Sequence, residues 1–243
     1  MAPVLIVGAG PTGLAVACGL LAAGVDVVIA DAADGPVRTS RALGVQPRGV
    51  EVLDRLGALA DLPERSVHMA GTVIHVHGRE KMRLRVPPGE VLGGRSALII
   101  SQAEIEAQLR TRLAELGGSI EWGREVTGAR QHPDGVTASF GDCATARYDW
   151  LVGGDGAGSR VRKSTGIRLV GDTGPERYLL ADVQVDLPVE RGYASMWAGA
   201  GGSLAALPLP GQDRWRLMAP APSGATDDVP PRTRSGAVHQ RSA

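Results

Sequence analysis

The N-terminal part of the chain alternates between apolar runs and a glycine-rich turn. Residues 4–7 (Val-Leu-Ile-Val) form a continuous apolar run that is β-branched at three of four positions, which is typical of a parallel strand covered on both faces. A helix-compatible stretch, residues 14–23, ends at Gly24, and a second apolar run covers residues 25–30. The pattern predicts strand, helix and strand, with the first strand at the centre of an α/β sheet.

Helical and alternating patterns recur further along the chain. Residues 101–104 (Ser-Gln-Ala-Glu) have the spacing of a capping box and introduce a helix that ends at Gly117. One face of this helix carries Ile105, Leu109, Leu113 and Leu116. A short helix is expected over about 49–56. Strands are expected at 72–77, 119–121, 125–129, 136–140, 150–152, 176–186, 192–197, 203–207 and 214–218.

Composition narrows the class of protein and its partners. The 243 residues are 43% hydrophobic, enough for a sizeable core, and 26 basic residues balance 26 acidic ones. Because no broad basic field is present, neither nucleic acid nor an anionic membrane is an expected partner. Glycines interrupt the N-terminal apolar run, so it suits neither a signal peptide nor a membrane span. The expected location is the cytoplasm.

Cysteines and histidines provide no metal-like pattern. Cys18 and Cys143 are far apart, and both are interpreted as small buried or half-buried fillers. His75 and His77 alternate on one predicted strand with His68 nearby, but no cysteine or carboxylate at suitable spacing completes a site. A solvated strand face is therefore expected there, and no metal site.

The turn between the first strand and the first helix carries the spacing Gly-x-Gly-x-x-Gly. Gly8 permits a tight turn, Gly10 allows the backbone to approach a pyrophosphate, and Gly13 lets the helix lie close to the strand. The N-terminus of the helix, near Thr12, would face the phosphates with free N–H groups and the positive end of its dipole. The spacing in this context predicts a dinucleotide site.

An acidic residue follows at the end of the second predicted strand. Asp31 lies where a carboxylate accepts hydrogen bonds from the two hydroxyls of an adenosine ribose. Since a carboxylate there disfavours a 2′-phosphate, FAD or NAD is the expected ligand rather than NADP. A purely structural glycine turn is the alternative, and the order of strand, turn, helix, strand and acid argues against it.

Beyond Asp31 the regular alternation of a nicotinamide dehydrogenase does not continue. Residues 38–59 instead form an arginine-rich loop followed by the short helix. Here the chain resembles the FAD-dependent aromatic hydroxylases related to para-hydroxybenzoate hydroxylase, especially the polyketide and rifampicin hydroxylases. The run at 41–48 (Arg-Ala-Leu-Gly-Val-Gln-Pro-Arg) is similar to their loop after the second strand. The resemblance implies that Arg41 reaches the FAD phosphates.

Further positions extend the resemblance. It implies that Gln102, at the start of the capped helix, hydrogen-bonds the flavin cofactor, and that the strand containing Val126 lies against the adenine.

The most specific match follows the apolar strand at 150–152, as Asp-Gly-x-x-Ser-x-x-Arg. This second fingerprint of the family includes Asp155, Gly156, Ser159 and Arg162. The resemblance implies that this turn touches the FAD pyrophosphate and helps NAD(P)H to dock. Asp-Gly is also a common turn dipeptide, but its position after an apolar strand and after the first glycine motif favours function.

The resemblance implies a fold in two interleaved parts. A Rossmann-like FAD-binding domain would comprise residues 1–70 and 96–175, and an antiparallel β-sheet substrate domain residues 71–95 and 176–222, with 223–243 a disordered polar tail. Family members continue into a Gly-Asp-Ala-Ala motif that holds the ribityl chain, and that motif does not occur here. The fold is therefore expected to be incomplete at its C-terminus, with weak FAD binding and little or no hydroxylase turnover from this chain alone.

The implied activity is hydroxylation of a small aromatic or polyketide substrate, using NADH or NADPH and oxygen through a flavin C4a-hydroperoxide. Since the flavin carries this chemistry, no catalytic side chain is assigned. Two alternatives stay open: a truncated, inactive FAD- or nucleotide-binding remnant, and a small flavin reductase or NAD-dependent dehydrogenase. The Arg41 loop and Asp155-Gly156 argue against the last.

Overall fold

Both faces of the first strand are covered, as its apolar run predicts. β1 (Val4–Val7) lies between β12 (Trp150–Gly153) and β2 (Val27–Ala30) in a parallel sheet, with β8 (Ile120–Glu121) beyond β2. All four residues of β1 are buried, and its predicted central position is confirmed. The computed structural model describes residues 3–37, 43–86, 96–171, 174 and 177–222.

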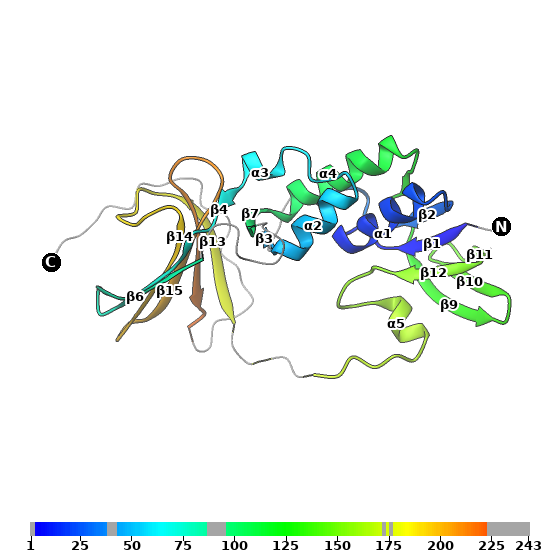
Figure 1. Cartoon of the computed structure of the whole chain (residues 1–243). Helices are drawn as coiled ribbons and strands as arrows, with labels where there is room; N and C mark the ends of the chain where they lie inside the picture. Colours follow the sequence, from blue (N-terminus) through cyan, green and yellow to red (C-terminus); the bar gives the residue numbers. More distant parts are fainter. Residues whose placement is uncertain (1–2, 38–42, 87–95, 172–173, 175–176, 223–243) are drawn as a thin grey trace.

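Helices cover one face of the parallel sheet (Figure 1). α1 (Pro11–Ala22), α2 (Pro47–Arg55) and α4 (Gln102–Glu115) pack together with Val4 and Ile6 in one hydrophobic cluster. The short helix α2 begins two residues before its predicted start, with Pro47 in its first turn. Beside these helices lie α3 and a small sheet with the order β3-β7-β4. Their bounds are Leu62–Arg65 for α3, Leu43–Val45 for β3, Leu98–Ser101 for β7 and Val67–His68 for β4.

An antiparallel sheet covers the other face. β9 (Val126–His132), β10 (Gly135–Phe140) and β11 (Thr145–Tyr148) pack with Leu5 and Val7 in a second cluster. Alternate residues of β10 are buried, as the apolar alternation predicts. The parallel sheet therefore lies between helices and a second sheet, and the predicted α/β class is confirmed. A last short helix, α5, spans Arg160–Ser164.

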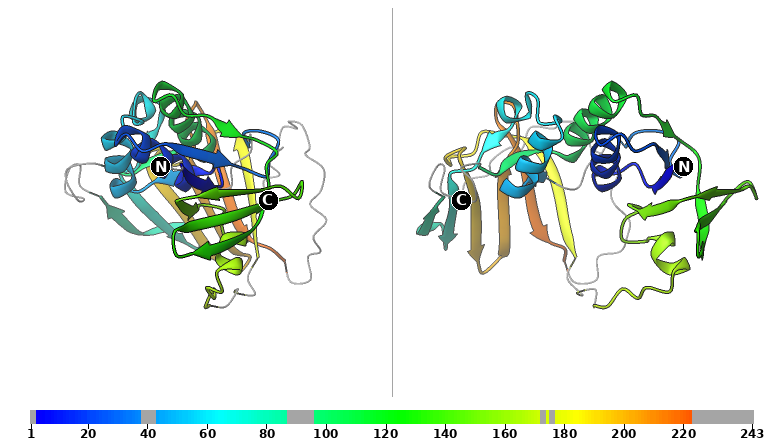
Figure 2. Two further views of the ribbon diagram at one scale, coloured as in Figure 1. Left: turned by 90° about the vertical axis from the view of Figure 1, so that its right-hand side faces the viewer. Right: turned by 45° about the vertical axis from the view of Figure 1, so that its right-hand side comes forward.

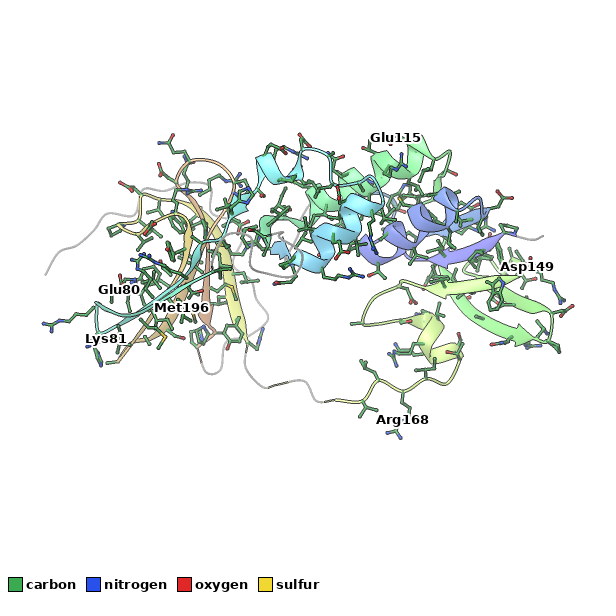
Figure 3. The ribbon with its side chains drawn as sticks, viewed as in Figure 1. Glu80, Lys81, Glu115, Asp149, Arg168 and Met196 are labelled. Carbon is green, nitrogen blue, oxygen red and sulfur yellow. The ribbon has the colours of Figure 1, made fainter. Side chains whose placement is uncertain are left out.

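A six-stranded sheet stands at the opposite end of the molecule (Figure 1 and Figure 2). Its order is β13-β16-β15-β14-β5-β6. The hairpin β5–β6 comes from the first half of the chain and the other four strands from the second half. The bounds are β5 Gly71–Val76, β6 Arg79–Arg85, β13 Tyr178–Gln184, β14 Tyr193–Gly199, β15 Gly202–Pro208 and β16 Arg214–Pro220. Glu80 and Lys81 project from the hairpin near its tip (Figure 3).

The six-stranded sheet differs from the antiparallel sheet expected from the sequence at one pair. β14 pairs with β5 in parallel, with Tyr193 opposite Gly71 and Ala198 opposite Val76. The direction of β14 relative to β5 depends on the path by which the chain returns to the β5–β6 hairpin. The alternation of apolar and polar residues is the same for either direction and cannot predict it. The predicted division into domains stays a prediction.

Three local expectations were wrong in detail. Ser101 caps α4 by accepting from the Ala103 N–H, while the carboxylate of Glu104 pairs with Arg65 of α3 instead of turning back to the cap. Cys143 is exposed, in the turn between β10 and β11. His75 is not on a solvated face, because it is partly buried and stacks on Trp197 with ring centroids 5.3 Å apart.

The buried cysteine does behave as a filler. Burial raises the pKa of the Cys18 thiol, which keeps it protonated and unreactive. Within the described ranges, no helix has the length and apolar character needed to cross a membrane. The predicted tail, residues 223–243, lies outside the described residues.

Candidate functional site

The first glycine turn is closed by close backbone packing. Gly8, with φ of +98°, donates its N–H to the Ala30 carbonyl at 2.8 Å and so ties the turn to the end of β2. A Cβ on Gly13 would fall far inside van der Waals contact with the Gly8 carbonyl oxygen. Because no side chain fits there, α1 starts directly against the strand that leads into it.

The second glycine turn interlocks with the first. The Gly154 N–H donates to the Val7 carbonyl at 2.7 Å, at the end of β1. A Cβ on Gly154 would lie 3.1 Å from the Gly13 Cα, and one on Gly8 would lie 2.5 Å from the Gly154 carbonyl oxygen. Glycines from two distant sequence motifs therefore form one continuous backbone surface at the carboxyl edge of the sheet.

The N-terminus of α1 is open to a ligand on the side away from this packing. Gly10 is the N-cap residue, and no side chain caps the N–H groups there. Pro11 occupies the first turn. Within the described part of the chain, a Cβ on Gly10 would meet no atom within 4 Å apart from its own chain neighbours, and Thr12 is exposed. The first-turn N–H groups and the helix dipole can therefore receive an anionic group.

Asp31 lies next to the same turn. Its Oδ2 accepts from the Ala9 N–H at 2.6 Å, and its Oδ1 accepts from the Ala33 N–H at 2.8 Å. These bonds hold the carboxylate between the glycine turn and the loop after β2. Since each carboxylate oxygen can accept a second hydrogen bond, Asp31 retains the capacity to bind a pair of hydroxyls.

Helix α4 brings Gln102 to the same end of the fold as the glycine turns. The Cys18 thiol donates to the Leu109 carbonyl at 3.5 Å, and a Cβ on Gly118, just past the C-terminus of α4, would meet the side chain of Leu21 in the last turn of α1. α1 and α4 therefore run in the same direction, with their N-termini side by side. Gln102 occupies the first position of α4, and its amide Nε2 donates to Glu106 at 2.7 Å.

Asp155 organises the second turn. Its carboxylate accepts from the Ser159 hydroxyl at 2.6 Å and from the N–H groups of Arg160 and Val161 at 2.6 and 3.1 Å. Burial alone would raise the pKa of Asp155, but these hydrogen bonds outweigh it and hold the pKa below its usual value. The anion is stabilised by its own segment, and Ser159 in turn caps α5 by accepting from Arg162.

The remaining predicted residues take different positions. Gly156 lies in the exposed part of the turn with φ of +76°. The Arg162 guanidinium donates to the carbonyls of Ile167 and Ala157 at 3.3 and 3.5 Å, so it contacts both flanks of α5. Val126 is 4% exposed and packs in the cluster beneath the parallel sheet. Arg41 lies outside the described residues.

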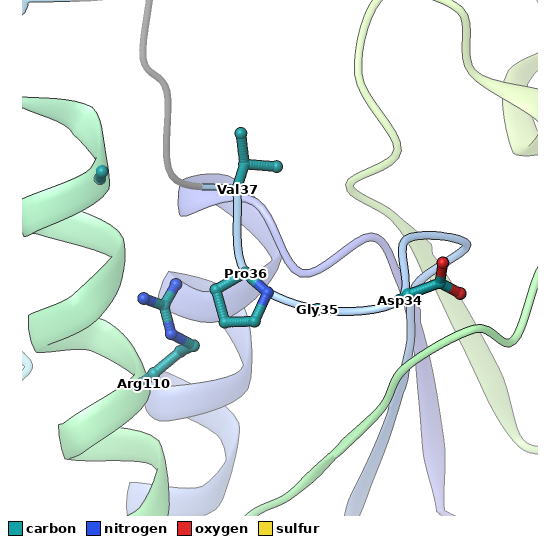
Figure 4. Close-up of a pocket in the computed structure, with 6 residues that line it drawn as sticks. Asp34, Gly35, Pro36, Val37 and Arg110 are labelled. Atoms are coloured by element: carbon teal, nitrogen blue, oxygen red, sulfur yellow. The ribbon is translucent and has the colours of Figure 1, made fainter.

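A cavity of about 670 Å³ opens between the loop after β2 and α4 (Figure 4). Its lining residues are Asp34, Gly35, Pro36, Val37, Ala103 and Arg110. Arg110 extends from α4 toward Pro36. Its lining includes Ala103, which follows Gln102 in the first turn of α4, and the loop residues that come shortly after Asp31 in the chain.

Sequence reasoning missed three participants. Gly154 provides the contact between the two turns, which only the folded chain reveals. Glu106 and Arg110 follow Gln102 at intervals of four residues, a helical spacing that places them on one face of α4 and that the sequence does display. The glycine, Asp31 and Gln102 positions are brought together at one edge of the fold, while Arg162 lies with α5.

The chain matches known proteins along most of its length. The FAD binding domain family matches residues 1–240. The 6-methylpretetramide 4-monooxygenase of Streptomyces rimosus is 36% identical over 219 residues, covering 88% of this chain and 39% of that protein. The dialkyldecalin synthase of Streptomyces rugosporus is 32% identical over 189 residues, covering 75% of this chain and 38% of that protein.

Solved structures agree. The structure of the flavin-dependent monooxygenase PieE in complex with FAD and substrate superimposes with a TM-score of 0.83 and 28% identity, covering 94% of this chain and 44% of that one. The chain thus spans about two fifths of the length of the curated relatives that it matches. With the glycine turns, the acid after β2 and the family match in agreement, this chain belongs to the FAD binding domain family of flavoprotein hydroxylases.

Proposed function

We propose that the protein acts in FAD-dependent monooxygenation of an aromatic or polyketide substrate, with NADH or NADPH as electron donor. The observation that carries the proposal is the interlocked pair of glycine turns beside Asp31, in a chain that belongs to a family of FAD-dependent hydroxylases. A named monooxygenase at 36% identity supports the reaction class. Because another relative is named as a dialkyldecalin synthase and not as a monooxygenase, the activity needs a test of its own.

The described residues fit the ADP half of FAD. Space at Gly10 and the uncapped N-terminus of α1 suit the pyrophosphate, and spare acceptor capacity at Asp31 suits the adenosine ribose. Gln102, at the adjoining N-terminus of α4, would meet the next part of the cofactor. The fit rests on the open space at Gly10, on the N–H donors at the N-terminus of α1, and on the acceptor oxygens of Asp31.

The protein's contribution in this proposal is to bind and orient. Bound FAD would supply the redox chemistry, taking electrons from a nicotinamide and delivering them to dioxygen. Asp155 fixes the shape of the second turn through bonds to its own segment, and the Gly154 N–H holds that turn against the end of β1, beside the pyrophosphate cradle. Arg162 is proposed to help a nicotinamide dock, and the six-stranded sheet is proposed to carry the substrate side.

The substrate proposal extends the relatives' reactions to a chain that covers only part of their length. An aromatic or polyketide compound is proposed because the name of one relative, 6-methylpretetramide 4-monooxygenase, gives such a molecule as its substrate. The chain contains only 3% aromatic residues, so the surface it offers to a substrate is mainly aliphatic. The cytoplasmic location and the absence of nucleic-acid partners remain predictions from composition.

The proposal is tested first by flavin retention. The purified chain is mixed with FAD and passed through a gel-filtration column equilibrated with FAD, so that weak binding is also detected, and the absorbance spectrum of the protein peak is recorded relative to the column buffer. We expect a protein-bound flavin spectrum, with Gly10→Ala as the matched variant that folds but retains less. No flavin in the wild-type peak, even after incubation with a large excess of FAD, would contradict the proposal.

Turnover is tested on the same preparation. NADH and NADPH oxidation are followed with panels of phenolic and polyketide compounds. Substrate-dependent oxidation with a hydroxylated product supports monooxygenation. Retained flavin without any such oxidation would favour the alternative, an FAD-binding module that does not turn over by itself.

A further inference from the structure

One face of α4 carries a ladder of three polar side chains. Gln102, Glu106 and Arg110 are spaced four residues apart, so they lie one above another along the helix. Gln102 Nε2 donates to Glu106 Oε1 at 2.7 Å, and Arg110 Nη1 lies 3.8 Å from Glu106 Oε2. The ladder begins at the N-terminus of α4, and its last member, Arg110, lines the cavity.

Glu106 is a costly residue at its position. It is 7% exposed, and among the residues that the structure describes no other carboxylate is buried to this degree. A buried carboxylate destabilises a fold unless hydrogen bonds and an opposite charge compensate it. Among the described residues, the polar partners of Glu106 are Gln102 and Arg110, both on its own helix.

The contact between Glu106 and Gln102 determines the orientation of the amide. An ionised carboxylate only accepts hydrogen bonds, so the NH₂ group of Gln102 must face Glu106. The carbonyl oxygen of the same amide is then directed away from Glu106. Without Glu106, either end of the amide could face the ligand at similar free energy, because the amide presents a donor on one side and an acceptor on the other.

We propose that Glu106 is a positioning residue that holds the carbonyl oxygen of Gln102 toward the cofactor, where it accepts a hydrogen bond from a cofactor hydroxyl. Arg110 balances the charge of Glu106, which would otherwise repel the nearby pyrophosphate. The hydroxyl belongs either to the ribityl chain or to the adenosine ribose. The inference rests on the proposed FAD binding and specifies what one residue of that site recognises.

The test is a double-mutant cycle on cofactor binding. The dissociation constant of FAD is measured by flavin fluorescence for wild type, Glu106→Gln, Gln102→Ala and the double variant. Glu106→Gln keeps the volume but lets the Gln102 amide turn, so we expect binding to weaken about threefold to tenfold, the equivalent of one ordinary hydrogen bond. In the Gln102→Ala background the same change should have no further effect, because the amide that Glu106 orients is absent.

The controls separate positioning from loss of structure. Glu115→Gln removes a carboxylate from the far end of the same helix, where Glu115 pairs with Arg112 at 2.9 Å in an exposed position (Figure 3). This variant should bind FAD as the wild type does. Melting temperatures are recorded for all variants. If the single change unfolds the chain, Glu106→Gln with Arg110→Met serves as a second variant, which removes both charges of the Glu106–Arg110 pair.

A parallel titration with ADP identifies the hydroxyl. ADP retains the adenosine ribose and lacks the ribityl chain, so an effect on FAD but not on ADP assigns the contact to the ribityl chain. Equal effects on both assign it to the ribose. Weakening by Glu106→Gln that persists in the Gln102→Ala background, or no weakening in a folded variant, overturns the inference alone. Failure of the wild type to bind either probe overturns both the inference and the proposed function.

Discussion

Gly10 and Gly13 lie in one turn, yet a methyl group would have opposite consequences at the two positions. At Gly13 the methyl carbon would collide with the backbone of Gly8, which has no room to move because Gly154 packs against it. At Gly10 the backbone has φ of −75° and ψ of −179°, which any residue can adopt, and the methyl group would project into open space. We therefore expect that a side chain at Gly13 would disturb the fold, whereas one at Gly10 would obstruct the ligand.

The pair gives a matched prediction. Gly13→Ala should lower the free energy of unfolding by about 1–3 kcal/mol through overpacking. Gly10→Ala should change it by less than about 0.5 kcal/mol and weaken FAD binding at least tenfold, about 1.4 kcal/mol. Urea denaturation and fluorescence titration measure the two effects. A Gly10→Ala variant that binds FAD like the wild type would show that the pyrophosphate lies elsewhere.

Asp155 leads to a prediction about acid. Its pKa in the folded protein is held below the ordinary value of 3.8, so the unfolded chain binds this proton more readily. The stabilisation is therefore fully present above pH 3.8 and is lost as the pH falls through the lowered pKa. Asp155→Asn should remove this component. Its unfolding free energy should differ from that of the wild type at pH 7 and approach it in acid, as measured by denaturation at each pH.

At the scale of the element, α4 matters because it carries Gln102 to the N-terminus of α1. Ser101 begins the helix by accepting from the Ala103 N–H at 3.3 Å, and the Glu104–Arg65 pair at 2.5 Å ties the first turn to α3. Ile105, Leu109 and Leu113 anchor the buried face in the cluster shared with α1. Local capping therefore determines where the helix starts, and packing determines what its first residue faces.

Removal of the cap should test the first part of this argument. Ser101→Ala should lower the free energy of unfolding by about 1 kcal/mol, since one first-turn N–H loses its partner. Thr111→Ala is the control, because Thr111 is exposed in the middle of the same helix and alanine is a better helix former there. Thermal and urea denaturation compare the two. Equal losses would show that the Ser101 hydroxyl does not stabilise the helix.

For the whole molecule, the six-stranded sheet joins chain segments that are distant in sequence. The hairpin β5–β6 gains its neighbour only when β14 pairs with β5, more than a hundred residues later in the chain. Arg83 of the hairpin pairs with Glu190 at 2.8 Å and lies over the ring of Tyr193, which reinforces the same junction. The sheet contributes no strand to the parallel sheet that carries the glycine turns.

This separation predicts distinct effects for two tryptophans. Trp215 is 1% exposed in β16, and Trp215→Ala should lower the free energy of unfolding by about 3–5 kcal/mol. FAD affinity of the folded fraction should remain unchanged, because the residue belongs to the other sheet. Trp150→Phe is the control, since Trp150 is 72% exposed and its replacement should cost less than about 0.5 kcal/mol. A weaker FAD affinity in Trp215→Ala would mean that the two parts are coupled.

Much of the architecture could be read from local patterns. The apolar run of β1, the alternation of β10 and the Ser101 cap each have a signature within a few residues, because strand burial and capping are short-range properties. The parallel pairing of β5 with β14 has none, since either direction satisfies the same alternation. Partial burial of His75 likewise depends on Trp197, a residue on a strand distant in the chain.

The candidate site divides in the same way. The sequence by itself predicted the class of ligand, because the spacing of Gly8, Gly10, Gly13 and Asp31 is typical of a strand–turn–helix unit that binds a dinucleotide. Only the tertiary structure decided that Gly154 packs against Gly8 and Gly13, that the Asp155 carboxylate accepts hydrogen bonds from its own segment, and that Gln102 donates to a buried Glu106. These depend on which backbones meet at the edge of the sheet, and close approach between distant segments leaves no periodic trace in a sequence.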